Sequence, residues 1–266
     1  MSETPREFLA RWLPSGFLRG SAAFQVIGGV TAVASDVPSF LPALLLANHA
    51  VITAACLWPV SPLLGPNRVR LDAGAAGRRE VALTFDDGPD PEVTPWVLDY
   101  LDRHGAKATF FLIAARARRY PSLTAEIAAR GHTVGNHSFH HRVNFALQGV
   151  SALRRELADA QSALADLTGA VPRHFRAPAG MRNPWLQPML TPLGLELVSW
   201  TRRGLDGVWK QPDRVYERLV RNLEAGDILL LHDGATAVGS ALPLVQSVLP
   251  RLFERLDELS LKSAAL

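Results

Sequence analysis

The chain of 266 residues has ordinary proportions of apolar and charged residues, so it is long enough to form one domain of moderate size that buries its own core. Its single cysteine, Cys56, excludes an internal disulfide and a cysteine-rich zinc site, so any metal site must use histidine and carboxylate ligands. Basic residues barely outnumber acidic ones (28 against 25) and are scattered without interleaved aromatic residues, which argues against a nucleic-acid partner.

The first quarter of the chain is unusually apolar. After a basic N-terminal stretch, residues 1–20, the segment 21–64 contains no lysine or arginine and a single acid, Asp36. Its second apolar stretch is long enough to span a bilayer, which needs roughly 20 apolar residues, and its first is marginal. The composition predicts two apolar helices that form a membrane hairpin or lie on a membrane surface. Asn48 and His49 at mid-span leave a buried pair of helices as the alternative.

Arginines flank this segment on both sides, and residues 65–79 that follow it are interpreted as a linker. Positive charge on both flanks is typical of segments whose ends stay on the cytoplasmic side of a membrane. We therefore expect a bacterial inner-membrane protein whose downstream domain lies on the cytoplasmic face, with a periplasmic domain as the alternative. The flanking residues are Arg6, Arg11, Arg19, Arg68, Arg70, Arg78 and Arg79.

From residue 80 to residue 266, short apolar runs alternate with helix-like stretches. The clearest helix places Leu153, Leu157 and Leu164 on one face and is expected to turn Glu156 away from that face. Such an alternation predicts a parallel sheet that is open or closed into a barrel. The expected strands are 81–85, 108–113, 132–136, 173–177, 195–200 and 227–232.

Polar residues follow these strands at the points where they end. Asp86 and Asp87 come directly after the first strand, the motif "FRAPAG" closes the fourth, and His232 ends the last. Because the carboxyl ends of parallel strands meet at one edge of the sheet, where such folds bind ligands, we expect one common site there. Two adjacent carboxylates in that position lose hydration and repel each other unless a cation or a reacting proton lies between them.

The motif "NHSFHH", residues 136–141, follows the third expected strand. His137 and His141 are four positions apart, so they would project from one face of a helical turn, and a carboxylate from another strand end would complete a set of three metal ligands. Such a site with open positions suits catalytic zinc, although Fe2+, Co2+ and Ni2+ also fit these ligands. His140 has the wrong spacing from His137 for this role.

Four motifs, "TFDDGP", "HSFHH", "RAPAG" and "LLLHDG", in this order resemble those of the polysaccharide deacetylases, the group that shares the nodulation-type chitooligosaccharide deacetylase domain. The resemblance covers roughly residues 80–255 of a predicted domain, 80–266. It implies an α/β fold, a distorted (β/α) TIM-like barrel, which removes an N- or O-acyl group from a sugar with the help of a metal. The residues implied are the metal ligands Asp87, His137 and His141, the base Asp86 with its ionic partner Arg176, and the acid His232.

These roles are chemically consistent with amide hydrolysis. An amide carbonyl resists attack by water, and a metal that polarises its oxygen lowers that barrier. Asp86 would accept the proton of the attacking water, and Arg176 would keep this carboxyl ionised. The backbone N–H near Ala179 is expected to contribute to an oxyanion hole. His232 must be cationic to protonate the leaving amine, which an adjacent carboxylate would favour.

One segment departs from the family pattern. The family usually carries an acid-rich stretch ending in Asp-Trp that lines the pocket and tunes the catalytic histidine, whereas this chain has "SWTRRGLDGVW" at residues 199–209. We expect Trp200 to line the pocket, and Asp206 either tunes the histidine or caps a loop. Arg202 and Arg203 form either a guanidinium pair that recognises phosphate or a solvated basic loop.

The predicted function is hydrolysis of an acetyl or formyl group from an N-acylated sugar, oligosaccharide or lipid-linked glycan. The alternatives are an esterase for O-acyl groups of soluble or cell-wall polysaccharide, a non-catalytic glycan-binding barrel, and a membrane scaffold. The presence of both Asp86 and His232 argues against a binding domain, which needs neither a base nor an acid. A lipid-linked sugar is favoured, because an apolar segment would hold the barrel beside the lipid and the arginine pair would meet its phosphate.

Overall fold

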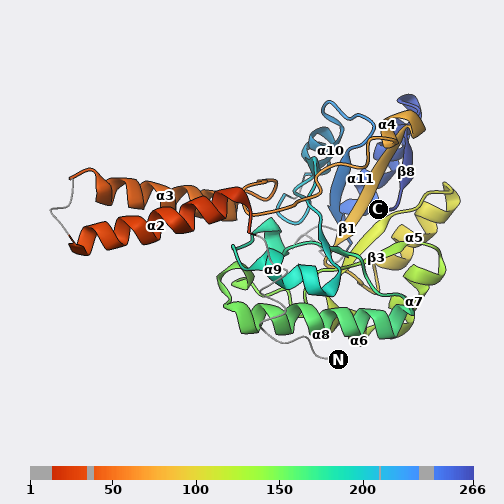
Figure 1. Cartoon of the computed structure of the whole chain (residues 1–266). Coiled ribbons are helices and arrows are strands. Elements are labelled where there is room, and N and C mark those ends of the chain that lie inside the picture. The colour runs from red at the N-terminus through yellow and green to blue at the C-terminus, as the bar shows by residue number, and fades with distance from the viewer. Residues whose placement is uncertain (1–13, 35–38, 210, 234–242) are drawn as a thin grey trace.

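A computed structural model of the chain describes residues 14–34, 39–209, 211–233 and 243–266. Its centre is a curled sheet of eight parallel strands in the order β5-β4-β3-β2-β1-β7-β6, with β8 beside the first residues of β1 (Figure 1). This confirms the predicted α/β fold and distorted barrel. The strands are β1 (Glu80–Asp86), β2 (Thr109–Leu112), β3 (Thr133–Asn136), β4 (His174–Phe175), β5 (Glu196–Leu197), β6 (Arg202–Arg203), β7 (Ile228–His232) and β8 (Lys262–Ala264).

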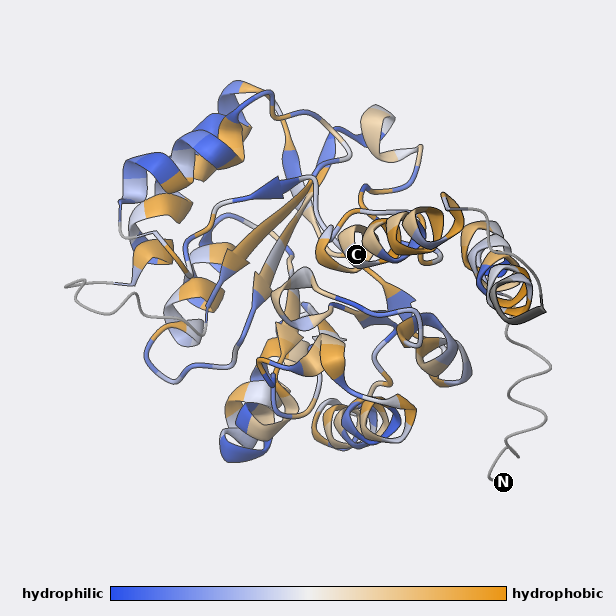
Figure 2. Cartoon of the chain, turned by 90° about the vertical axis from the view of Figure 1, so that its left-hand side faces the viewer, coloured by the Kyte–Doolittle hydropathy of each residue, from blue (hydrophilic) through white to orange (hydrophobic). Residues whose placement is uncertain are grey.

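The central strands are almost wholly apolar because both of their faces are covered. Phe85 of β1 stacks on Phe110 of β2, with ring centroids 5.1 Å apart, and helices cover the outer face of the sheet. Figure 2 shows the central strands in orange and the surrounding helices with orange and blue faces, the pattern that amphipathic helices need. The main helices are α5 (Thr94–Arg103), α6 (Ala114–Arg119), α7 (Pro121–Ala129), α8 (Val150–Thr168), α9 (Leu186–Leu190), α10 (Pro212–Val220) and α11 (Leu244–Glu258).

The predicted apolar face of α8 is confirmed, since Leu153, Leu157 and Leu164 are buried. The helix ends at Thr168 and is capped by Gly169. The prediction for Glu156 is wrong. Its side chain is buried at 7% exposure. This residue lies three positions after Leu153, so it shares the apolar face and needs polar partners inside the protein.

Two strands were not predicted, and two others are much shorter than predicted. β6 consists of two arginines, and β8 pairs only with the start of β1, so neither shows the apolar run that identifies a buried strand. β4 and β5 have two residues each in place of five and six. The sheet is therefore irregular on the side where β4, β5 and β6 lie.

The segment predicted as a linker lies along that irregular side. Arg68 forms a β-bridge with Val198, and its backbone N–H donates to Leu197 at 2.9 Å. Arg70 forms a second bridge with Asp227, just before β7. A short helix, α4 (Ala75–Arg78), then leads into β1. The segment thus fills the space between the β5 and β7 sides of the barrel.

The N-terminal apolar segment forms two helices, α2 (Gly16–Ala34) and α3 (Leu41–Leu57), which project from the barrel as a hairpin (Figure 1). Ser21 Oγ donates to Asn48 Oδ1 at 3.0 Å, and Gln25 Nε2 lies 3.0 Å from His49 Nδ1. The mid-span polar residues therefore pair the two helices with each other. Apolar side chains on the outside of the hairpin are solvent-exposed, including Val26, Ile27 and Leu46.

The predicted inner-membrane location is contradicted. Within the described ranges of the chain, no helix is both long enough and apolar enough to cross a bilayer. The apolar stretch 40–64 is long enough as sequence, but α3 ends at Leu57, and the following residues turn onto the barrel, where Leu64 is buried. Arg6 and Arg11, two of the flanking arginines on which the predicted orientation depends, lie outside the described residues, as does Asp36.

Candidate active site

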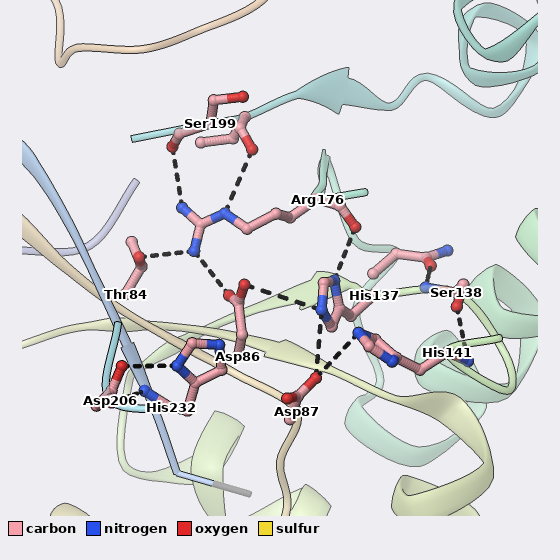
Figure 3. Close-up of polar contacts among 12 residues, drawn as sticks. Thr84, Asp86, Asp87, His137, Ser138, His141, Arg176, Ser199, Asp206 and His232 are labelled. Atoms are coloured by element: carbon pink, nitrogen blue, oxygen red, sulfur yellow. Dashed lines mark hydrogen bonds and ion pairs between the residues drawn. The ribbon is translucent and has the colours of Figure 1, made fainter. Parts of the chain in front are cut away.

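The predicted site residues gather at the carboxyl edge of the sheet, around a cavity of about 190 Å³. Asp86 ends β1, His137 follows β3, Arg203 ends β6 and His232 ends β7. Figure 3 shows the polar contacts among the central residues. The cavity is lined by Asp86, Asp87, His137, His141, Ala179, Gly180, Trp200, Arg203, Leu205, Gly207, Val208, Leu230 and His232.

The adjacent residues Asp86 and Asp87 have different surroundings. Asp86 is buried as the last residue of β1 and accepts a hydrogen bond from Arg176 Nη1 at 2.7 Å. Asp87 has left the strand with a φ of 72°, and its carboxylate is turned toward the two histidines (Figure 3). Gly88 follows because a side chain there would collide with Asp233, whose carboxylate oxygen would lie 2.5 Å from the added Cβ.

Arg176 is fully buried beneath the pocket and is held from several sides. Its guanidinium donates to Thr84 Oγ1 at 2.7 Å and to the Ser199 carbonyl at 3.1 Å, and it lies 4.1 Å from the ring centroid of Phe111. Burial lowers the pKa of Arg176, and the charge of Asp86 opposes that shift. The two buried charges therefore compensate each other, as buried ions must.

His137 and His141 both face Asp87, although not from the helical turn that their spacing predicts. Asp87 Oδ1 lies 3.4 Å from His137 Nε2 and 3.3 Å from His141 Nε2. The segment between the histidines is a loop with left-handed backbone at Ser138 (φ 64°) and His141 (φ 52°). The Ser138 hydroxyl accepts the His141 N–H at 3.0 Å, which holds the second histidine in place without a helix.

These three residues fit a divalent metal. Bonds of about 2.1 Å to a tetrahedral metal would set its ligand atoms roughly 3.4 Å apart, which is the spacing of Asp87 to each histidine. Asp87 Oδ1 is buried without a hydrogen-bond partner. His137 Nδ1 donates to the Arg176 carbonyl at 2.8 Å, so Nε2 keeps its lone pair for the cluster.

The charge states of Asp87 and His141 agree with that assignment. Burial by itself would raise the pKa of Asp87, but the close contact with His137 at 3.4 Å and the nearby histidine charges hold it well below its usual range. Burial lowers the pKa of His141, and the charge of His137 adds to that shift. An ionised carboxylate and a neutral imidazole are the forms that bind metal. Burial by itself would lower the pKa of His137, but Asp86 and Asp87 raise it, so this imidazole would release a proton when a metal binds.

His232 is on the other side of the cavity and is bound to Asp206. Its Nδ1 lies 2.8 Å from Asp206 Oδ1, and its backbone N–H donates to Asp206 Oδ2 at 2.7 Å. Burial would lower the pKa of His232, but the charge and hydrogen bond of Asp206, together with the charges of Asp86 and Asp87, raise it to about 9. Of the two roles that the sequence left open for Asp206, the structure shows the contact that tuning of His232 requires.

The remaining predicted residues divide into two groups. Ala179, Trp200 and Arg203 line the cavity. Arg202 does not line it, because its guanidinium bonds Asp227 at 2.9 Å and the Asn222 carbonyl. The structure therefore brings only one of the two adjacent guanidiniums to the site.

Sequence reasoning missed Glu156 of α8, which holds the histidine loop from behind. Its Oε2 accepts the backbone N–H groups of Phe139 (3.1 Å) and His140 (3.0 Å). Its Oε1 lies 2.7 Å from His140 Nδ1 and 3.2 Å from Arg142 Nε. The signal that could have revealed it is an acid on the apolar face of an amphipathic helix.

Comparison with known proteins agrees with this geometry. The sequence profile of the family described as polysaccharide deacetylase matches residues 73–198. A chitooligosaccharide deacetylase of Azorhizobium caulinodans is 37% identical over 157 residues, which cover 58% of this chain and 73% of that protein. A peptidoglycan-N-acetylglucosamine deacetylase of Bacillus cereus is 33% identical over 174 residues, which cover 65% and 81%.

A solved structure shares both the fold and part of the sequence. The family 4 carbohydrate esterase of Streptomyces lividans, determined in complex with acetate, superimposes with a TM-score of 0.63 at 30% identity, covering 70% of this chain and 91% of that one. The chain belongs to the polysaccharide deacetylase family. The predicted family is thereby confirmed, and the predicted enzyme class, a hydrolase of sugar N-acyl groups, is that of these relatives.

Proposed function

We propose that the chain is a metal-dependent hydrolase that removes an N-acetyl group from a glucosamine-containing sugar. The observation that carries this proposal is that the two adjacent aspartates have different partners. Asp87 contacts the two histidines, whereas Asp86 is bound to Arg176. A ligand set beside a separate base is what hydrolysis of an amide needs. The named activities of the relatives support the same reaction.

The metal would be held by Asp87, His137 and His141, and when bound it would supply a Lewis acid for the acyl carbonyl. Zinc suits these ligands best, and Fe2+, Co2+ and Ni2+ also fit. Asp86 is the general base. Arg176 occupies Asp86 Oδ1, while Oδ2 lies 3.8 Å from His137 Nε2 on the side of the ligand cluster and is placed to take a proton from water.

His232 supplies the proton for the leaving nitrogen. The raised pKa keeps its imidazole cationic at neutral pH, and the bond to Asp206 through Nδ1 directs Nε2 as the donor. An amine leaves poorly unless it is protonated, so a strongly protonated acid favours an N-acyl over an O-acyl substrate. The same pair argues against a purely glycan-binding barrel, which has no use for a buried acid and base.

The test separates metal binding from catalysis with purified variants of the full chain. His141→Ala is expected to lose tight binding of one metal per chain, measured by elemental analysis, together with release of acetate from N-acetylglucosamine oligosaccharides. Asp86→Asn is expected to keep the metal and lose turnover by at least about a hundredfold. His49→Ala, a histidine on the exposed hairpin, is the matched control. Full metal content in His141→Ala would contradict the ligand assignment.

A lipid-linked sugar, favoured by the sequence, stays a narrower prediction for this same site. The observation that supports it is the charge-poor hairpin of α2 and α3, which exposes apolar side chains and is followed by Pro59, a neighbour of the cavity residue Gly180. Two substrates with the same N-acyl sugar, one free and one attached to a phospholipid, test it. Equal kcat/KM for the two would exclude a role for the lipid.

A further inference from the structure

Arg203 differs from Arg176 and Arg202 because it has no carboxylate partner. Arg176 is paired with Asp86 and Arg202 with Asp227. Within the described part of the chain, Arg203 forms no ion pair, and its Nε is buried without a hydrogen-bond partner. Its guanidinium lies 5.2 Å from the ring centroid of Trp200, and both side chains line the cavity.

The Arg203 guanidinium loses part of its hydration in the cavity, and no anionic partner compensates for that loss. Burial lowers the pKa of Arg203, and the charges of Asp86 and Asp206 oppose that shift, but an arginine keeps its proton in either case. Removing a charge from water without a partner is unfavourable, and a ligand that brings an anion removes that penalty. Stacking on an indole ring also fixes the guanidinium plane, which suits two parallel hydrogen bonds to a carboxylate or phosphate.

We propose that Arg203 binds an oxyanion carried by the substrate, so that the sugar bears a carboxylate or a phosphate close to its N-acyl group. This inference rests on the proposed function of the site. The anion must be close because Arg203 and the Asp87, His137 and His141 cluster line the same cavity of about 190 Å³, which is below the usual size of a pocket for a whole drug-sized ligand. Arg203 is then a specificity-determining residue.

The first experiment measures binding without turnover. The metal-loaded Asp86→Asn chain is titrated calorimetrically with N-acetylglucosamine, with its 1-phosphate, and with N-acetylmuramic acid, which carries a carboxylate. At least one charged sugar is expected to bind about ten- to a hundredfold more tightly than the neutral one, as a charged hydrogen-bond pair provides. Whether the phosphate or the carboxylate shows the gain identifies the source of the anion.

The second variant carries Arg203→Gln in the same background and is expected to lose that preference while it still binds the neutral sugar. Arg203→Lys is expected to keep only part of the preference, because an ammonium lacks the planar pair of donors. Arg214→Ala, which removes an exposed arginine of α10, controls for the change in net charge and should keep the full preference. If Arg203→Gln binds all three sugars like its parent, the proposal is wrong.

Kinetics on the chain with Asp86 restored distinguish this proposal from a general electrostatic role. Arg203→Gln is expected to raise KM for the charged substrate by about ten- to a hundredfold and to change KM for the neutral substrate much less. An equal loss of kcat on neutral and charged substrates would mean that Arg203 serves Asp86 or Asp206, and would overturn the proposal. Anion binding through Arg203 in a chain that deacylates none of the sugars would instead refute the proposed function alone.

Discussion

At the scale of single residues, the site depends on how two neighbouring carboxylates are separated. Asp86 remains in β1 and is neutralised by Arg176, whereas Asp87 turns out of the strand toward His137 and His141. The separation follows from the alternation of side chains along a strand and from the left-handed backbone at Asp87. Neighbours in sequence can therefore serve as base and ligand without competing for the same position.

The ion pair of Asp86 and Arg176 predicts a specific pattern of stabilities. Arg176→Met leaves a buried carboxylate without a partner and is expected to lower the free energy of unfolding by about 3–5 kcal/mol at neutral pH. Combining it with Asp86→Asn removes both charges and should recover much of that loss, which urea unfolding of the metal-free chain can measure. A double variant no more stable than Arg176→Met would show that the guanidinium acts through packing.

The pair of His232 and Asp206 predicts the pH dependence of turnover. Activity that requires protonated His232 is present below its pKa of about 9 and is lost as the pH rises through that value. Asp206→Asn removes the largest contribution that raises this pKa while burial still lowers it, so the basic limb of kcat/KM should move to lower pH. Asp159→Asn, an exposed acid of α8, is the control and should leave the limb in place.

At the scale of elements, the loops at the carboxyl edge carry the site in backbone conformations that side chains disfavour. Asp87, Ser138, His141, Ala179 and Leu205 all have positive φ values between 52° and 72°. Each such residue costs of order 1–2 kcal/mol, so these loops need support from the strands and helices around them. The loop that carries the histidines receives this support from α8 through Glu156.

That support can be measured as metal affinity. Glu156→Gln keeps the volume of the side chain but replaces one acceptor of the backbone N–H groups of Phe139 and His140 with an amide. We expect the dissociation constant for the metal, measured by competition with a chelator, to rise about 10- to 100-fold, as loss of an outer-shell partner does. Asp166→Asn on the same helix is the control. Unchanged affinity with a lower melting temperature would limit Glu156 to a structural role.

At the scale of the whole molecule, the hairpin and the barrel are joined by a short segment that packs behind residues of the pocket wall. The Pro59 carbonyl accepts hydrogen bonds from Asn67 and Ser199, and Arg182 donates to the Ser61 carbonyl. A side chain at Gly180 would collide with both Pro59 and Trp200, so these three residues are closely packed where Gly180 and Trp200 line the pocket. The barrel therefore uses residues that precede its first strand.

This arrangement predicts how the chain tolerates truncation. A chain that starts at residue 54 omits α2 and most of α3 but keeps the joining segment, and its thermal unfolding should stay close to that of the full chain. A chain that starts at residue 65 also loses buried Leu64 and the hydrogen bonds of Pro59. That loss is roughly 3 kcal/mol, or about 6–12 °C in Tm for a barrel of this size. Equal Tm values for both truncations would contradict the described packing.

The sequence by itself determined the elements whose pattern is local. The buried runs of β1, β2 and β7 and the apolar face of α8 were predicted close to their observed positions, because apolar periodicity is a property of neighbouring residues. The expectation that the polar residues after these strands share one edge also followed from the sequence, since parallel strands end at the same side of a sheet.

Only the tertiary structure decided which side chains meet there, because that depends on contacts between residues far apart in the chain. Arg202 and Arg203 are adjacent, yet as neighbours in a strand they point to opposite faces, and only Arg203 reaches the cavity. Glu156 binds the backbone of the histidine loop only because that loop packs on α8. The end of α3 at Leu57 likewise depends on the barrel surface that receives the residues after it, which no hydropathy pattern encodes.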